Sequence, residues 1–218
     1  MTVIHLPPVE KPAPPAAEPL LRLPPVTTIL IIALVVIHAS AALAAQIWDN
    51  GVWLAIYTQF GFMPLSLAQG SYWAVVTLLS AGFLHGGWLH LGVNVAMLTA
   101  CGGGVERLLG PKWLLILLIG GIIIGNLTFF AFDPHSVGPL IGASGGISAL
   151  FGACMLLLGP VNRRQIFAFL GIFIAISVLQ TLMGGPGGES IAGAAHIGGF
   201  AYGLCVALWL RSRLSQSI

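Results

Sequence analysis

A serine stands among small residues in the segment Gly142–Gly146, at the head of an apolar run. Other polar side chains that could act with it lie upstream, at His90 and Asn94, and downstream, at His196. Serine is a weak nucleophile unless a positioned base takes its proton, and histidine is the usual base. We therefore expect Ser144 to be a nucleophile and His196 to be its general base.

His90 and Asn94 are four residues apart, which places them on one face of a helix. Their imidazole and amide groups could donate hydrogen bonds to the oxyanion of a tetrahedral intermediate, together with the backbone N–H of Ser144. Glu106 is expected near the opposite membrane face, so no carboxylate offers itself to orient the histidine. These residues predict a catalytic dyad.

The composition places this chemistry in a membrane. Of the 218 residues, 57% are hydrophobic and only 6% are charged, whereas soluble domains carry roughly 25% charged residues. Polar groups within lipid are costly and usually functional, which favours an intramembrane serine hydrolase. The net charge of +2, with no basic cluster, gives no indication of nucleic-acid binding.

Apolar runs of roughly 20 residues can cross the hydrocarbon core. They predict an all-α membrane protein with six transmembrane helices and a first outer loop, residues 50–73, that lies in the membrane interface. Residues 1–25 are rich in proline and predict a disordered cytoplasmic tail, followed by a membrane domain at 26–213 and a short cytoplasmic tail at 214–218. The predicted spans are 26–47, 86–108, 113–132, 144–158, a fifth that ends at about Met183, and 191–210.

Positive charge predicts the orientation of these spans. With the N-terminus inside, all eight basic residues fall on the cytoplasmic side, as the positive-inside rule requires. The fourth span, about 22 Å long at 1.5 Å per residue, is shorter than the hydrocarbon core of about 30 Å. Ser144, at its outer end, should therefore lie below the outer surface in a water-accessible pit. The basic residues are Lys11, Arg22, Arg107, Lys112, Arg163, Arg164, Arg211 and Arg213.

Small residues predict which helices pack together. Gly199 and Gly203 form a GxxxG pattern, and small residues at such spacing let two helix backbones approach closely in lipid. His196 shares this face, while Ser144 shares a face of the fourth span with Ser148. Packing alone would explain the glycines but not the serine and the histidine.

In these segments the chain resembles the rhomboid family of intramembrane serine proteases. The resemblance implies a six-helix core, Ser144 as nucleophile, His196 as general base, and His90 and Asn94 as oxyanion donors. It also implies cleavage of peptide bonds in or beside transmembrane segments of other proteins. We predict that a substrate helix enters laterally, between the second and fifth helices. The matching residues are Trp73, 83–94 (FLHGGWLHLGVN), 103–107 (GGVER), 142–145 (GASG) and 195–203 (AHIGGFAYG). Further implied roles are structural for His85 and Glu106, and packing or substrate gating for Trp73, Gly142, Gly145, Gly199 and Gly203.

Two positions depart from the family pattern and keep a second hypothesis open. Ala74 follows Trp73 where many members have arginine, and Ser148 stands where many have an aromatic residue that packs on the catalytic histidine. A catalytically impaired relative that binds transmembrane clients is therefore the alternative function.

Two other classes explain less of the sequence. Histidines in or beside the spans, including His38, could ligate haem, but Ser144 and Asn94 would then have no role. The G-x-S-x-G pattern also fits the nucleophile elbow of soluble α/β-hydrolases, which needs a preceding strand, and no alternating pattern precedes Ser144. We expect no metal and no cofactor. The expected partners are transmembrane protein substrates and membrane lipids, in a bacterial inner membrane with both termini in the cytoplasm.

Overall fold

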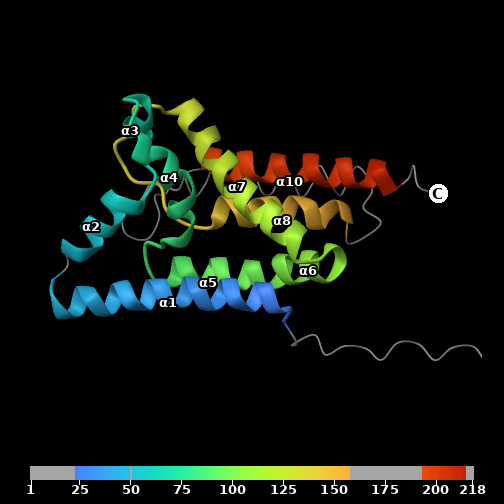
Figure 1. Cartoon of the computed structure of the whole chain (residues 1–218), viewed down its shortest axis with the longest axis horizontal. Helices are drawn as coiled ribbons and strands as arrows, with labels where there is room; N and C mark the ends of the chain where they lie inside the picture. The colour runs from blue at the N-terminus through green and yellow to red at the C-terminus, as the bar shows by residue number, and fades with distance from the viewer. Residues whose placement is uncertain (1–22, 50, 158–192, 215–218) are drawn as a thin grey trace, which may run out of the picture.

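The computed structural model describes residues 23–49, 51–157 and 193–214. The predicted fifth span and most of the proline-rich segment fall outside these ranges. The described residues form helices (Figure 1), and their only extended pairing is an isolated bridge between Phe62 and Leu140. The expected all-α class is confirmed.

Long apolar helices form the bundle, and four of them could cross a membrane by length and composition. They correspond to the predicted first, second, third and sixth spans, and α8 (Ser144–Leu157) corresponds to the short fourth span. The four are α1 (Pro25–Ile47), α5 (Trp88–Met97) continued through the π-helix η2 (Leu98–Gly102) into α6 (Gly103–Leu109), α7 (Pro111–Phe132), and α10 (Gly193–Leu214).

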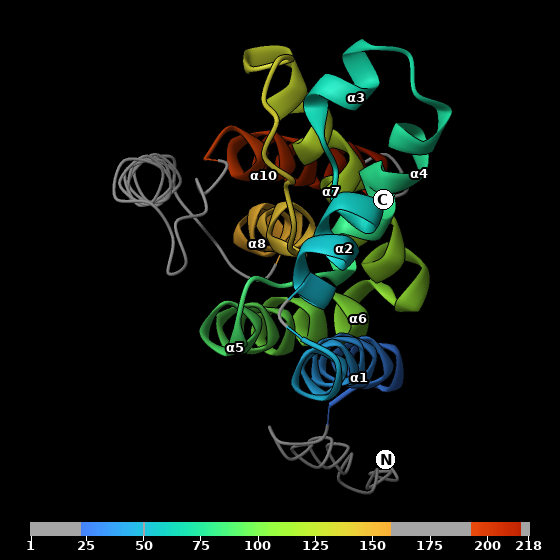
Figure 2. The same cartoon turned by 90° about the vertical axis from the view of Figure 1, so that its left-hand side faces the viewer.

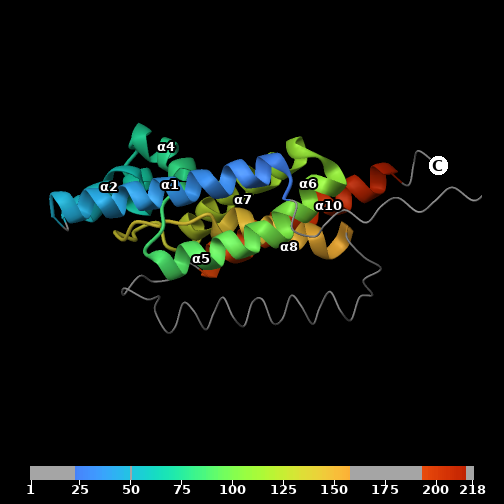
Figure 3. The same cartoon turned by 90° about the horizontal axis from the view of Figure 1, so that it is seen from below.

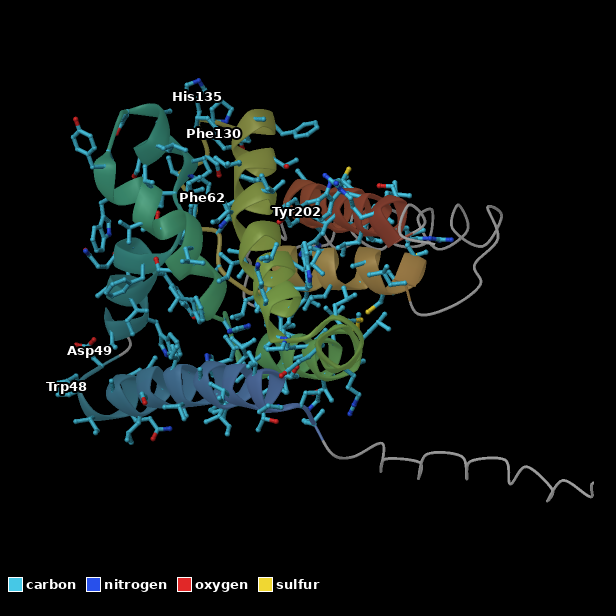
Figure 4. The ribbon with its side chains drawn as sticks, turned by 45° about the vertical axis from the view of Figure 1, so that its right-hand side comes forward. Trp48, Asp49, Phe62, Phe130, His135 and Tyr202 are labelled. Atoms are coloured by element: carbon cyan, nitrogen blue, oxygen red, sulfur yellow. The ribbon has the colours of Figure 1, made fainter. Side chains whose placement is uncertain are left out.

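Shorter helices replace the predicted interfacial loop. They are α2 (Gly51–Phe60), α3 (Pro64–Ala68), α4 (Tyr72–Ser80) and the 3-10 turn η1 (Ala81–Phe83). The apolar stretch from α4 to η1 has no counterpart among the predicted spans, because it is too short to cross the hydrocarbon. These helices lie at the end of the bundle where α1 finishes (Figure 1), and α2 begins beside Trp48 and Asp49 (Figure 4).

The two ends of the bundle carry different charges. The start of α1, α6, and the last turns of α8 and α10 lie at one end, opposite α2, α3 and α4 (Figures 1 and 3). Every basic residue of the described ranges belongs to that end, namely Arg107, Lys112, Arg211 and Arg213. This distribution agrees with the predicted orientation, which itself stays a prediction.

Helix α8 lies inside the bundle, between α10 and the α5–α6 helix (Figure 2). All but four of its residues are buried, and most of them are small or aliphatic. A helix covered by protein on all sides can carry a polar N-terminus at membrane depth, because no lipid reaches it. The fold therefore surrounds Ser144 with other helices.

Glu106 joins the start of α1 to α6. Its carboxylate accepts hydrogen bonds from the backbone N–H groups of Val26 at 3.0 Å and Thr27 at 2.7 Å, and from the Thr27 hydroxyl at 2.7 Å. The first N–H groups of a helix have no intrahelical acceptor, and a carboxylate there also interacts favourably with the helix dipole. Glu106 thus caps α1 from a different helix, at the end of the bundle away from Ser144.

Candidate active site

Ser144 and His196 lie in contact although 52 residues separate them. Ser144 is the first residue of α8 and His196 belongs to the first turn of α10. The Ser144 Oγ and His196 Nε2 atoms are 2.9 Å apart, and the pair is partly buried. When the hydroxyl donates to Nε2, the neutral ring carries its proton on Nδ1, which is the tautomer that a general base needs here.

Glycines of α10 allow it to pack closely against α8. A Cβ atom placed on Gly199 would collide with the backbone carbonyl of Gly145, and one on Gly203 would collide with that of Ala149. The GxxxG residues of α10 therefore lie directly on the backbone of α8. This contact sets the separation between the helices, and with it the distance from His196 to Ser144.

Gly142 allows the His90 ring to approach the backbone beside the Ser144 hydroxyl. Its φ of +117° is a conformation that favours glycine, and its N–H donates to the Ala81 carbonyl at 2.9 Å. A Cβ atom at Gly142 would lie 2.9 Å from His90 Nε2, which is too close, and 3.7 Å from Ser144 Oγ. The space that a side chain would occupy here therefore lies between the His90 ring and the nucleophile.

The hydrogen bonds of His90 indicate which of its nitrogens carries the proton. The backbone N–H of Gly86 donates to His90 Nδ1 at 3.4 Å. Because Nδ1 acts as an acceptor, the neutral ring carries its proton on Nε2, the atom that faces the space at Gly142. His90 thus presents an N–H donor beside Ser144.

Asn94 lies one helical turn below His90 and is buried, with 4% of its surface exposed. Its Nδ2 donates to the His90 backbone carbonyl at 2.8 Å. A carboxamide nitrogen carries two hydrogens, so this bond uses one of them and fixes the orientation of the group. The structure therefore brings together Ser144, His196 and His90, with Asn94 bonded to His90 directly behind.

The remaining predicted residues lie further from the nucleophile. His85 is buried, and its ring packs edge-on against His90 with 5.1 Å between centroids. Trp73 belongs to α4, and its Nε1 donates to the Gln59 carbonyl of α2 at 2.6 Å.

The two positions that depart from the family pattern are both buried. Ala74 is a buried residue of α4. The Ser148 hydroxyl donates to the Ser144 carbonyl at 2.7 Å, and this bond lies within α8. Neither position places a side chain on the Ser144 hydroxyl.

Two polar residues of the spans contribute more than the sequence indicated. Asn126 of α7 is buried and donates from Nδ2 to the Leu78 carbonyl of α4 at 2.9 Å. This bond attaches α4 to the bundle. His38 of α1 packs among aromatic rings of α2 and α5. The signal for both was a polar side chain within an apolar span. No group of three potential metal ligands occurs within the described ranges.

The chain is similar to known proteins of one family. Residues 69–213 match the model of the Rhomboid domain. The rhomboid protease GluP of Bacillus subtilis (strain 168) is 33% identical over 149 residues, which are 68% of this chain and 28% of that protein. The rhomboid protease GlpG of Yersinia pestis (strain Pestoides F) is 32% identical over 143 residues, or 65% of this chain and 50% of that protein. The matches therefore span half or less of the length of GluP and of GlpG.

Proposed function

Since this chain belongs to the rhomboid family, we propose that it is an intramembrane serine endopeptidase with a catalytic dyad of Ser144 and His196. The observation that carries the proposal is the 2.9 Å contact between Ser144 Oγ and His196 Nε2, at the partly buried N-terminus of α8. A hydroxyl paired with an imidazole is the minimal arrangement for nucleophilic acyl transfer.

The first half of the reaction forms an acyl-enzyme. Ser144 Oγ attacks the carbonyl carbon of the scissile peptide bond while its proton passes to His196 Nε2. The resulting imidazolium then protonates the nitrogen of the leaving amine as the C–N bond breaks. The acyl group remains on Ser144 as an ester, and the free amine departs with the other fragment.

The negative charge of the tetrahedral intermediate develops beside Gly142. His90 Nε2–H borders this space, and the backbone N–H of Ser144 lies at the first turn of α8, where helices have unsatisfied donors. The second hydrogen of the Asn94 amide donates to the oxyanion as well when the substrate carbonyl moves toward α5. Such preorganised donors are the usual means of stabilising an oxyanion.

Water completes the reaction. His196 takes a proton from a water molecule, the hydroxide attacks the ester carbon, and the proton returns to Ser144 Oγ when the acid product leaves. The substrates are transmembrane segments of other proteins. Their peptide bonds are shielded by helical hydrogen bonds, so the segment must unwind locally before Ser144 can attack.

This chain is an integral membrane protein, as its apolar helices and its family indicate. We further propose a bacterial inner membrane, with the basic end of the bundle in the cytoplasm. In this orientation, the Ser144 end of α8 points toward the outer face of the membrane.

Labelling with a fluorophosphonate probe tests the function. The purified full chain in mild detergent should be labelled covalently, because an activated serine attacks the phosphorus and displaces fluoride. Ser144→Ala and His196→Ala should both abolish labelling while they retain the helical circular dichroism of the parent. Absence of labelling in the folded parent would contradict the proposal and favour a relative that binds transmembrane clients without cleaving them.

A further inference from the structure

His38 is a buried histidine that the proposed reaction does not use. It lies in the middle of α1, with 3% of its surface exposed. Its ring packs between Trp88 of α5, edge-on at 4.7 Å between centroids, and Trp53 of α2, at 5.2 Å. Its Nδ1 atom is buried without a hydrogen-bond partner. Because burying such a polar atom is costly, the surroundings of this ring call for an explanation.

Tyr57 and His38 both face the segment just before α5. The Tyr57 hydroxyl of α2 donates to the backbone carbonyl of His85 at 2.9 Å, and the His38 ring of α1 interacts with the backbone of the same residue. Side chains from two different helices therefore meet the backbone of one residue.

The His85 carbonyl is part of the same peptide unit as the Gly86 N–H that donates to His90. The carbonyl of His85 and the N–H of Gly86 form one planar peptide unit, and this N–H donates to His90 Nδ1 at 3.4 Å. Orienting the carbonyl at one end therefore orients the N–H at the other. Donation to the carbonyl also polarises the unit and strengthens the bond that its N–H makes.

We propose that His38 and Tyr57 are positioning residues that hold the His85–Gly86 peptide unit in place, so that its N–H keeps His90 oriented with Nε2–H toward the space beside Ser144. The inference rests on the proposed function, because it assigns the two residues an effect on the oxyanion donor of that reaction. It extends the site to α1 and α2, neither of which contains a residue of the reaction described above.

The test is a double-mutant cycle on the rate of fluorophosphonate labelling of the full chain in detergent. Tyr57→Phe removes only the hydroxyl, and His38→Phe keeps an aromatic ring but removes the ring nitrogens. Each should slow labelling by about fivefold, the value of a hydrogen bond of roughly 1 kcal/mol. In a His90→Ala background, the same substitutions should change the residual rate less than about twofold, because their effect acts through His90.

Two further variants separate positioning from folding. Thr58→Val also removes a hydroxyl from α2, but that hydroxyl donates within its own helix to Leu54 and Ala55, so labelling should stay at the parent rate. His38→Gln places an amide N–H near the position of the ring Nε2 and should restore most of the rate lost in His38→Phe. Thermal unfolding midpoints identify any variant that fails to fold. If His38→Phe does so, the Tyr57→Phe cycle decides.

Equal slowing in the presence and absence of His90 would overturn the inference, because the two residues would then act on the fold in general. An unchanged rate in the double variant Tyr57→Phe and His38→Phe would also overturn it. Both results leave the proposed function intact. A folded parent that is not labelled would overturn the function and this inference together.

Discussion

The Thr27 hydroxyl and backbone N–H both donate to the same oxygen of Glu106, each at 2.7 Å, across the junction between α1 and α6. The bonds are buried, and the carboxylate lies at the positive end of the α1 dipole. Replacing this carboxylate should therefore loosen the attachment of α1 to the bundle without touching the nucleophile.

Glu106→Gln should lower the free energy of unfolding by about 2 kcal/mol, the cost of losing charge-assisted hydrogen bonds in a buried position. The NH₂ group of the new glutamine is itself a donor, so it could not accept a hydrogen bond from Val26 or Thr27 as the carboxylate oxygen does. Thermal unfolding in mild detergent measures the loss, and Thr27→Ser, which keeps the hydroxyl, is the control that should stay near the parent midpoint. An unchanged midpoint in Glu106→Gln would show that the cap contributes little.

Gly199→Ala should separate α8 from α10. The added methyl group would collide with the Gly145 backbone, and moving a helix by even 1 Å can cost about 100-fold in rate when it misplaces catalytic groups. We expect fluorophosphonate labelling to fall by at least that factor. Gly92→Ala is the matched control, because a Cβ atom there would meet nothing within 4 Å. Similar rates in the two variants would argue against a helix contact that sets the dyad distance.

His90→Ala and Asn94→Ala should remain folded but lose about 10² to 10³ in kcat on a transmembrane substrate, because removing one oxyanion donor has this effect in other hydrolases. KM should change little, since the charge develops only in the transition state. The control is His135→Ala, which removes an exposed histidine of the α7–α8 loop and should leave kcat unchanged. A rise in KM at constant kcat would instead assign His90 or Asn94 to substrate binding.

Substrates with glycine or proline near the cleaved bond should react faster than substrates with a regular helix there. Glycine and proline weaken a helix by roughly 1 and 3 kcal/mol relative to alanine, which lowers the cost of local unwinding. Replacing them with leucine or alanine in a substrate segment should reduce cleavage in a reconstituted assay. Cleavage that is insensitive to these changes would mean that unwinding does not limit the reaction.

The span pattern and the types and order of the polar residues could be read from the sequence alone. Composition and hydropathy specify lipid as the solvent, because a chain with so few charges cannot cover a globular surface. The glycine spacing at Gly199 and Gly203 predicts close helix packing, since only a residue without Cβ permits it. These are local properties of the chain, and the helices α1, α7, α8 and α10 follow them.

The relationships between distant segments required the tertiary structure. The 2.9 Å contact of Ser144 with His196, the capping of α1 by Glu106 and the hydrogen bond from Tyr57 to the His85 carbonyl each join distant segments. A sequence shows that such groups exist, but their partners depend on the helix crossings and on the backbone bends that connect them. A lone tyrosine such as Tyr57 acquires a partner, and a proposed role, only when the fold places a particular carbonyl beside it.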